Sequence, residues 1–117
     1  MWFNLKDSRK DVEFSQAVAA YLGHLQGQGL IESYRLTRRK FGFGPEGLGE
    51  FHCEVHFQDL AQFDKAFGLV ATRTGEVERL HIPVYSAVTD FKSALYRDFP
   101  DAERGNGERG AGKCHQI

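Results

Sequence analysis

The segment from Phe51 to Phe57 alternates apolar and polar residues with a period of two. Side chains of a β-strand point alternately to the two faces of a sheet, so this period predicts a strand. We expect its apolar residues to face a core. Its ionisable neighbours on the opposite face are Glu50, His52, Glu54 and His56, and any chemistry is expected there.

The first forty residues predict a strand, a helix and a second strand. Residues 2–6 alternate as a short strand. A helix follows, because Ser8 and Asp11 resemble a capping box and apolar residues then recur at helical spacing. This apolar stripe comprises Phe14, Val18, Tyr21, Leu22 and Leu25. Gly27 and Gly29 are expected to end the helix, and residues 31–41 alternate weakly as a second strand.

Glycines between residues 42 and 49 predict a loop before the strand that begins at Phe51. Asp59 can then cap a second helix, whose expected stripe comprises Leu60, Phe63, Phe67 and Val70. We expect one further helical turn over residues 76–81 and a fourth strand over residues 84–91, with Pro83 at its entry. An alternative begins that strand at Val77.

The order strand, helix, strand, strand, helix, strand predicts an α+β, ferredoxin-like βαββαβ fold with two helices on one face of an antiparallel sheet. In the usual strand order 4-1-3-2, the first and third strands are neighbours. Trp2, Asn4 and Lys6 should therefore lie beside the ionisable residues of the third strand. Such a sheet commonly covers its helix-free face by pairing with a second copy, so we expect a homodimer.

Length and composition narrow the class of protein. The 117 residues suit one domain, which we place at residues 1–100, followed by a flexible tail at 101–117 that has few apolar residues. Fifteen basic against sixteen acidic side chains disfavour a nucleic-acid partner. No apolar run reaches the roughly 18 residues that span a bilayer. We expect a cytoplasmic protein without a membrane partner and without a disulfide between Cys53 and Cys114.

Three stretches carry a resemblance to known proteins. They are Phe3 to Lys6, the hairpin from Arg38 to Pro45, and Thr89 to Phe91 followed by Leu95 to Asp101. Together with the element order, they resemble the dimeric α/β-barrel superfamily, and more narrowly an uncharacterised bacterial family of such domains. The resemblance implies pairing of two chains sheet to sheet. Relatives in the superfamily include cofactor-free monooxygenases, haem-degrading enzymes and small isomerases or lyases, but none of their catalytic motifs is matched here.

A metal site on the strand at 51–57 is disfavoured by spacing. Same-face residues four apart on a strand are separated by about 13 Å, so His52 and His56 cannot bind one ion. Glu54 with one of them would need a third ligand, such as His81. We therefore assign no metal and no cofactor.

Acid–base chemistry is the stronger hypothesis for this face. A carboxylate beside a histidine positions its ring for proton transfer, which makes His52, Glu54 and His56 candidate catalytic residues, with Asn4 as a neutral hydrogen-bonding group. Candidate substrate contacts are Trp2, Lys6, Tyr34, Arg35 and Phe43. Whether Tyr34 or Arg35 reaches the site depends on which way the second strand faces. The competing interpretation is that the same groups fix the register of a dimer.

The glycine-rich loop at 42–49 contains G-x-G-x-x-G but leads into a strand, whereas a dinucleotide site requires a following helix. A mobile hairpin tip explains it better, with Phe43 able to close over a cavity. The sequence thus predicts a homodimeric protein that binds a small organic compound, for example an aromatic one, in a sheet-lined cavity, as a binding domain or a cofactor-free enzyme. The alternatives are a non-catalytic assembly protein and a metal-binding variant of the same fold.

Overall fold

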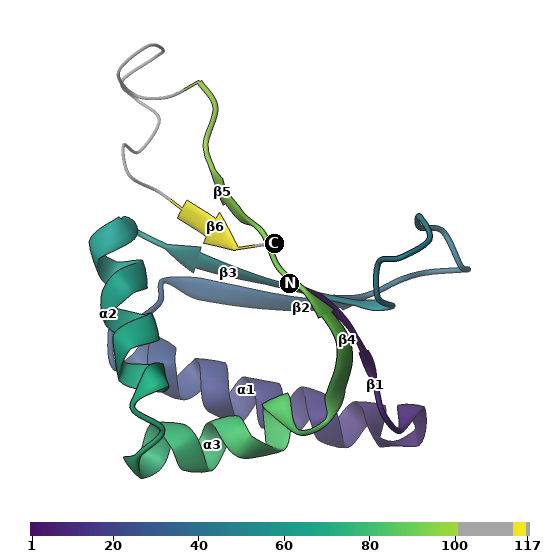
Figure 1. Ribbon diagram of the computed structural model, residues 1–117, viewed down its shortest axis with the longest axis horizontal. Helices are drawn as coiled ribbons and strands as arrows, with labels where there is room; N and C mark the ends of the chain where they lie inside the picture. Colours follow the sequence, from purple (N-terminus) through teal and green to yellow (C-terminus); the bar gives the residue numbers. More distant parts are fainter. Residues whose placement is uncertain (101–113, 117) are drawn as a thin grey trace.

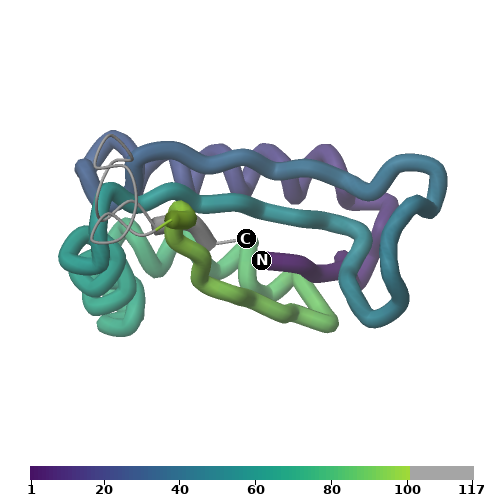
Figure 2. The backbone as a smooth tube through the Cα atoms, turned by 90° about the horizontal axis from the view of Figure 1, so that it is seen from above, coloured from purple at the N-terminus to yellow at the C-terminus, as the bar shows by residue number. Residues whose placement is uncertain are grey.

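The fold is a mixed α+β arrangement of an antiparallel sheet and three α-helices, as seen in a computed structural model that describes residues 1–100 and 114–116 (Figure 1). In chain order the elements are β1 (Trp2–Leu5), a 3-10 turn (Ser8–Lys10), α1 (Asp11–Gly27), β2 (Ser33–Arg38), β3 (Phe51–Phe57), α2 (Leu60–Ala71), α3 (Gly75–Tyr85), β4 (Val88–Lys92), β5 (Leu95–Arg97) and β6 (Cys114–Gln116). The three helices leave the opposite face of the sheet bare, which Figure 2 shows from above.

Four strands make up the main sheet. β1 pairs with β3 on one side and with β4 on the other, and β2 pairs with the far edge of β3, always antiparallel. Trp2 lies opposite His52, and Arg35 lies opposite Glu54. The short strand β6 pairs with the end of β3 and with β5. This register decides which side chains share the helix-free face.

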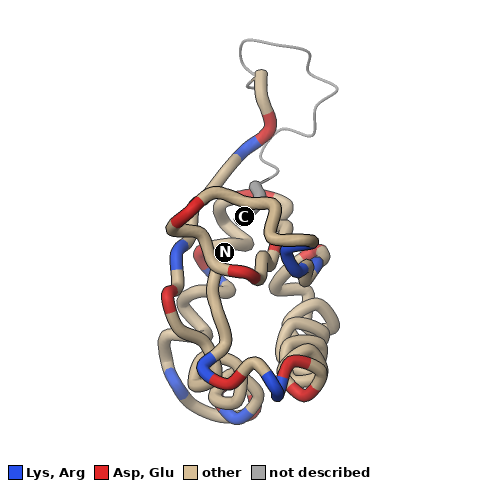
Figure 3. Tube along the Cα trace, turned by 90° about the vertical axis from the view of Figure 1, so that its right-hand side faces the viewer, with Lys and Arg blue, Asp and Glu red and all other residues tan. Residues whose placement is uncertain are grey.

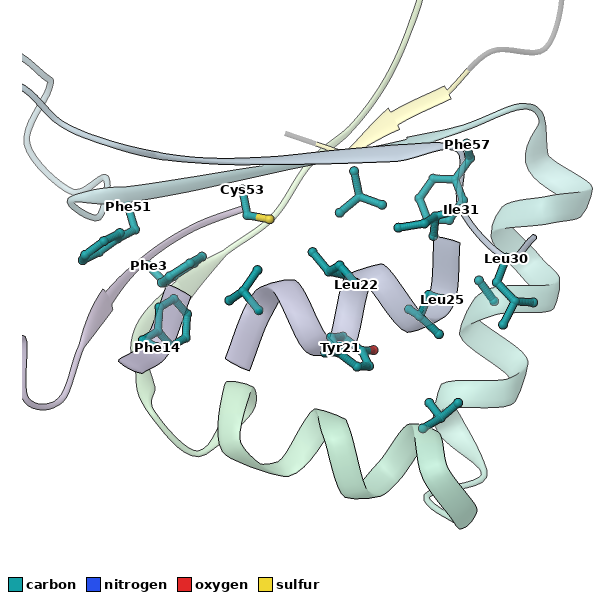
Figure 4. Packing of buried hydrophobic residues seen from close by; sticks show 14 residues of the cluster. Phe3, Phe14, Tyr21, Leu22, Leu25, Leu30, Ile31, Phe51, Cys53 and Phe57 are labelled. Carbon is teal, nitrogen blue, oxygen red and sulfur yellow. The ribbon is translucent and has the colours of Figure 1, made fainter. Parts of the chain in front are cut away.

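The predicted alternation of β3 is confirmed. Phe51, Cys53, Val55 and Phe57 are buried, while the three ionisable residues between them are half-buried on the other face. Figure 4 shows the apolar side chains of β3 pointing down toward α1, where Phe3 and Phe14 meet them. The aromatic rings of Phe3 and Phe51 stack with their centroids 5.9 Å apart. One apolar layer therefore joins the sheet to the helices.

The predicted stripe of α1 is also confirmed, since all five of its residues are buried. The start of this helical segment differs from the prediction. Asp7, rather than Ser8, is the cap, and its carboxylate accepts a hydrogen bond from the Arg9 backbone N–H at 3.1 Å. Asp59 caps α2 as predicted, accepting from the Gln62 N–H at 2.8 Å. A carboxylate at a helix start accepts from exposed N–H groups and also interacts favourably with the positive end of the helix dipole.

The segment from residue 75 to residue 85 is a third helix, so the prediction of two helices was wrong. The expected strand start at Val84 was also wrong, because β4 begins at Val88. Pro83 suggested a strand entry, yet it lies inside α3. Val77 is buried, and Leu80 and Val84 pack against the core. This helical stripe outweighs the cost of proline near the end of the helix, where only one backbone hydrogen bond is lost.

Two other sequence predictions concern the surface and the chain end. Acidic and basic residues are mixed along the chain in the view of Figure 3, in keeping with the near-zero net charge. Among the described helices, none has the length and apolar character needed to cross a bilayer. Of the tail predicted at 101–117, residues 101–113 and 117 lie outside the described residues.

Candidate functional site

The helix-free face brings Glu54 and His56 together. The Glu54 carboxylate contacts Nε2 of His56, and both side chains are about 30% exposed (31% for His56, 30% for Glu54). Ser33 on β2 lies opposite His56, and Arg35 lies opposite Glu54. Partners in an antiparallel register share a face. The result is a polar, ionisable patch in the middle of the sheet.

His52 belongs to a different environment on the same face. Its ring lies against Trp2, with the centroids 5.4 Å apart, and no hydrogen bond joins it to Glu54. Its Nε2 atom is buried without a hydrogen-bond partner among the described residues. Burial lowers the pKa of His52 below its usual value, with a smaller effect of the nearby α-amino group. Of the two candidate histidines, only His56 is in contact with Glu54.

Asn4 lies away from the Glu54–His56 contact. Its Oδ1 accepts a hydrogen bond from the Glu50 N–H at 2.8 Å, and its Nδ2 donates to Asp90 at 3.2 Å. Because β1 runs antiparallel to β3, residues after Trp2 pair progressively closer to the start of β3. The expectation that Asn4 and Lys6 lie beside Glu54 and His56 was therefore wrong. Lys6 instead lines a separate cavity of about 350 Å³ near the start of α1.

The register of β2 resolves the open choice between Tyr34 and Arg35. Arg35 shares the face of Glu54, whereas Tyr34 lies opposite Val55 and packs against the core on the helix side. Phe43 is 81% exposed at the tip of the β2–β3 hairpin and lines neither of the two cavities described here. Of these two candidates, Arg35 is thus the one that lies on the polar face.

Metal and thiol chemistry find little support in the part of the chain that the structure describes. No group of three or more His, Cys, Asp or Glu side chains there is arranged to hold a metal ion. Cys53 is buried in the core, and burial raises the pKa of its thiol to about 11. A thiol with such a pKa is almost entirely protonated at neutral pH, so Cys53 has a packing role.

The second candidate site is a cavity of about 380 Å³ on the other side of the sheet, between β1, β3 and β4 and the three helices. Its wall is almost entirely apolar and aromatic. The inner part is formed by buried residues that include Val18 and Leu22 from α1 and Cys53 and Val55 from β3. Figure 4 shows Cys53 and Leu22 pointing into the space between the sheet and α1.

Partly exposed aromatic residues lie around one side of this cavity. Phe67 from α2, Tyr85 from α3 and Phe91 from β4 all line it and are 47%, 38% and 54% exposed. Side chains that belong both to a cavity wall and to the surface mark its mouth. The opening therefore extends along α3, from α2 at one end of this helix to β4 at the other, as the arrangement of the three elements in Figure 1 shows.

His81 is a polar residue in the wall of this cavity, which also contains Ser93 and the tyrosines Tyr21 and Tyr85. Its ring stacks on Tyr21 of α1, with the centroids 4.6 Å apart, and meets the edge of Tyr85 at 4.8 Å. Sequence reasoning left open whether His81 reaches a cavity on the helix-free face; it lies on the opposite side. The signal available was the helical spacing of Val77, His81 and Val84, which places all three on one face of a helix.

Comparison with known proteins adds a family but no activity. No curated protein and no solved structure matches the chain. One family model covers residues 1–110, which is nearly the whole sequence. The chain therefore belongs to a family of unknown function, DUF6614.

Proposed function

We propose that this protein binds a small, uncharged organic molecule in the apolar cavity between the helices and the sheet. The observation that carries the proposal is the cavity itself, about 380 Å³ in a chain of 117 residues. Protein interiors are normally close-packed, with few voids larger than a water molecule. Ligand pockets, in contrast, are typically a few hundred Å³, mostly apolar, with a small number of polar groups.

The walls indicate an aromatic or similarly apolar ligand. Aromatic rings of Phe67, Tyr85 and Phe91 at the mouth offer stacking and edge contacts. An apolar cavity of about 150 Å³ is known to hold benzene. A space of about 380 Å³ therefore accommodates a fused two-ring compound.

A titration with 2-methylnaphthalene tests the proposal, followed by the NMR signals of the methyl groups that line the cavity. We expect saturable shifts in the wild-type protein and their loss in Val18→Phe, whose larger ring occupies the cavity. Val12→Phe makes the same change on the same helix at a position that is 66% exposed, and binding there should be unchanged. Thermal unfolding checks that both variants fold. Absence of saturable shifts in the wild-type protein would contradict the proposal.

We also propose that the chain is a ferredoxin-like domain that forms a homodimer through its helix-free face. Three observations support this: β1 lies between β4 and β3, the helices cover one face, and the other face carries Trp2 beside ionisable groups. In such a dimer, Glu54, His56 and Arg35 would fix the alignment of the two sheets. The contact between Glu54 and His56 also favours a second function, proton transfer on a compound enclosed between the two sheets.

Light scattering tests the dimer. We expect twice the chain mass at micromolar concentration and a monomer for Arg35→Glu, which places like charges opposite each other on this face. Arg9→Glu makes the same charge change in the 3-10 turn, where the side chain is 88% exposed, and should leave the dimer intact. A wild-type monomer would remove the dimer and the enclosed site between the sheets, but not the cavity in each chain.

A further inference from the structure

Two phenylalanines at the tip of the β2–β3 hairpin are almost fully exposed. Phe41 is 89% and Phe43 is 81% exposed, and the hairpin extends beyond the rest of the molecule at one end of the sheet (Figure 1 and Figure 2). A large apolar side chain that stays in water contributes nothing to folding through burial. Two such residues in one turn form an apolar patch, which on a folded protein is often a contact surface.

The backbone at the tip adopts a conformation that a phenylalanine disfavours. The Phe43 N–H donates to the Lys40 carbonyl at 2.9 Å, and the residues between them, Phe41 and Gly42, have φ angles of 54° and 72°. Positive φ at both central residues is typical of a type I′ turn, where asparagine, aspartate and glycine are preferred. The Cβ atom of Phe41 makes this left-handed conformation unfavourable. The residue thus opposes the fold without packing against its core, which points to a function at the tip.

The loop is braced below the tip, so the two rings are carried on a fixed support. Nη2 of Arg39 donates to the carbonyls of Leu48 at 2.7 Å and Gly49 at 3.4 Å, which joins the two halves of the loop. Lys92 of β4 donates to the Gly47 carbonyl and ties the loop to the sheet. A loop that is already ordered loses little conformational entropy when it binds a partner.

The charged residues near the tip are mostly basic. The Lys40 ammonium lies 5.7 Å from the centre of the Phe41 ring. Arg39 and Lys92 add two further positive charges, while Glu46 is the one acidic residue in the segment 39–49. This end of the molecule is therefore positive, although the whole chain has a net charge of −1. A positive apolar tip complements a surface that is both anionic and apolar.

We propose that the hairpin tip binds the surface of a membrane that contains anionic lipids, with Phe41 and Phe43 inserted between the headgroups and the cations facing them. Apolar residues that enter the interface beside Lys or Arg form a reversible surface anchor. The expectation of no membrane partner rested on the lack of a spanning segment, and binding to the surface requires none. The proposal depends neither on the cavity nor on the dimer.

The size of the tip favours a lipid surface over a folded protein. A phenylalanine buries about 150–250 Å² in a contact, so the two rings together supply about 300–500 Å². Their neighbours Gly42 and Gly44 add no side chains. A stable protein interface needs roughly 800 Å² from each partner. A lipid interface needs only rings that reach about 5–10 Å into it.

Sedimentation with lipid vesicles tests the proposal. We expect the wild-type protein to bind phosphatidylcholine vesicles that contain about one-third phosphatidylserine, with half-saturation at about 0.1–1 mM lipid. Phe41→Gly and Phe43→Ser should each weaken this binding about tenfold, because each removes one ring. Phe99→Ser changes the same type of residue, also 81% exposed, on a different segment, and should bind like the wild type. Glycine suits the turn, so Phe41→Gly should melt no lower than the wild type, which separates lost binding from lost folding.

The same assay tests the charges. Lys40→Glu should weaken binding to the anionic vesicles about tenfold and leave the weaker binding to pure phosphatidylcholine nearly unchanged. Lys65→Glu makes the same change on the exposed surface of α2, at the opposite end of the molecule (Figure 1). That variant should bind like the wild type, since salt screens charges at such a distance.

Fluorescence reports the insertion itself. In Phe43→Trp, lipids brominated in their acyl chains should quench the new tryptophan, whereas Trp2, the single tryptophan of the wild-type chain, gives the background. Failure of the wild-type protein to bind anionic vesicles at about 10 mM lipid would overturn the proposal. So would binding that persists when both phenylalanines are replaced, or an unquenched tryptophan at position 43. A smaller particle in light scattering for the double variant, without vesicle binding by the wild type, would assign the tip to a second copy instead and overturn the membrane contact.

Discussion

Replacing Gly49 by alanine is expected to separate the β2–β3 hairpin from β1. Gly49 is buried two residues before β3, where the backbone of Phe3 passes it. A Cβ atom at this position would lie 2.3 Å from the carbonyl carbon and oxygen of Phe3 and 2.5 Å from its nitrogen. Contacts under 3.0 Å are essentially never seen for real Cβ atoms, and backbone atoms cannot rotate away.

The size of the effect follows from this distance. The backbones must move apart by at least about 0.7 Å to reach 3.0 Å. A movement of this size stretches the hydrogen bond from the Glu50 N–H to Asn4 Oδ1, now 2.8 Å, to the limit of a hydrogen bond. Losing that bond and leaving a half-buried N–H unsatisfied costs about 1–3 kcal/mol. For a domain of this size, the melting temperature should fall by roughly 4–12 °C.

Thermal unfolding followed by circular dichroism measures this change. The matched control is Gly68→Ala on the exposed surface of α2, where an added Cβ meets nothing within 4 Å. That variant should gain about 0.5–1 kcal/mol, because alanine favours a helix over glycine. A melting temperature of Gly49→Ala within 1–2 °C of the wild type, roughly the effect of a few tenths of a kcal/mol, would refute the close approach of the hairpin and β1.

Three further predictions follow from single contacts. Asp59→Ala removes the cap of α2 and should cost about 1 kcal/mol in urea unfolding, whereas Asp59→Asn should retain most of the stability; equal losses would contradict a capping role. Burial lowers the pKa of His52 and His81, so near and below pH 6.5, roughly the usual histidine pKa, the unfolded chain binds more protons than the folded chain. The free energy of unfolding should therefore decrease from pH 7 toward pH 5, and less steeply in His52→Gln; an unchanged slope would exclude His52 as a cause. Finally, Cys53 should react slowly with a thiol reagent, since its thiol is buried with a pKa of about 11. In a Cys114→Ser background, we expect the reaction to be at least about a hundredfold slower in the native than in the denatured protein. Equal rates would contradict the burial of Cys53.

The local sequence pattern predicted the elements that have one clear period. The alternation in β3 and the apolar stripe of α1 gave the correct buried residues because each element exposes one face and buries the other. The pattern failed at α3, where Pro83 and the branched residues around it suggested a strand. Packing of Val77 against the core decides that segment, and such long-range contacts are invisible in a local window.

The candidate site was harder to predict, because a register relates residues far apart in the chain. The alternation of apolar and polar residues in β3 placed Glu54 and His56 on one face, and the structure brings them into contact. This alternation could not show the register of β1 against β3. In that register, residues after Trp2 lie toward the start of β3, so Asn4 lies beside Glu50 and not beside Glu54. The apolar cavity has no sequence signature at all, since its lining residues have the same composition as an ordinary core.

The central claim is that a ligand-sized cavity lies between the helices and the sheet. A crystal of the wild-type protein under xenon pressure tests it most directly, because xenon enters apolar cavities and is located by its strong scattering. We predict xenon in contact with Val18, Cys53 and Val84, which line the cavity. A core closed around these side chains, with xenon absent from it, would contradict the claim.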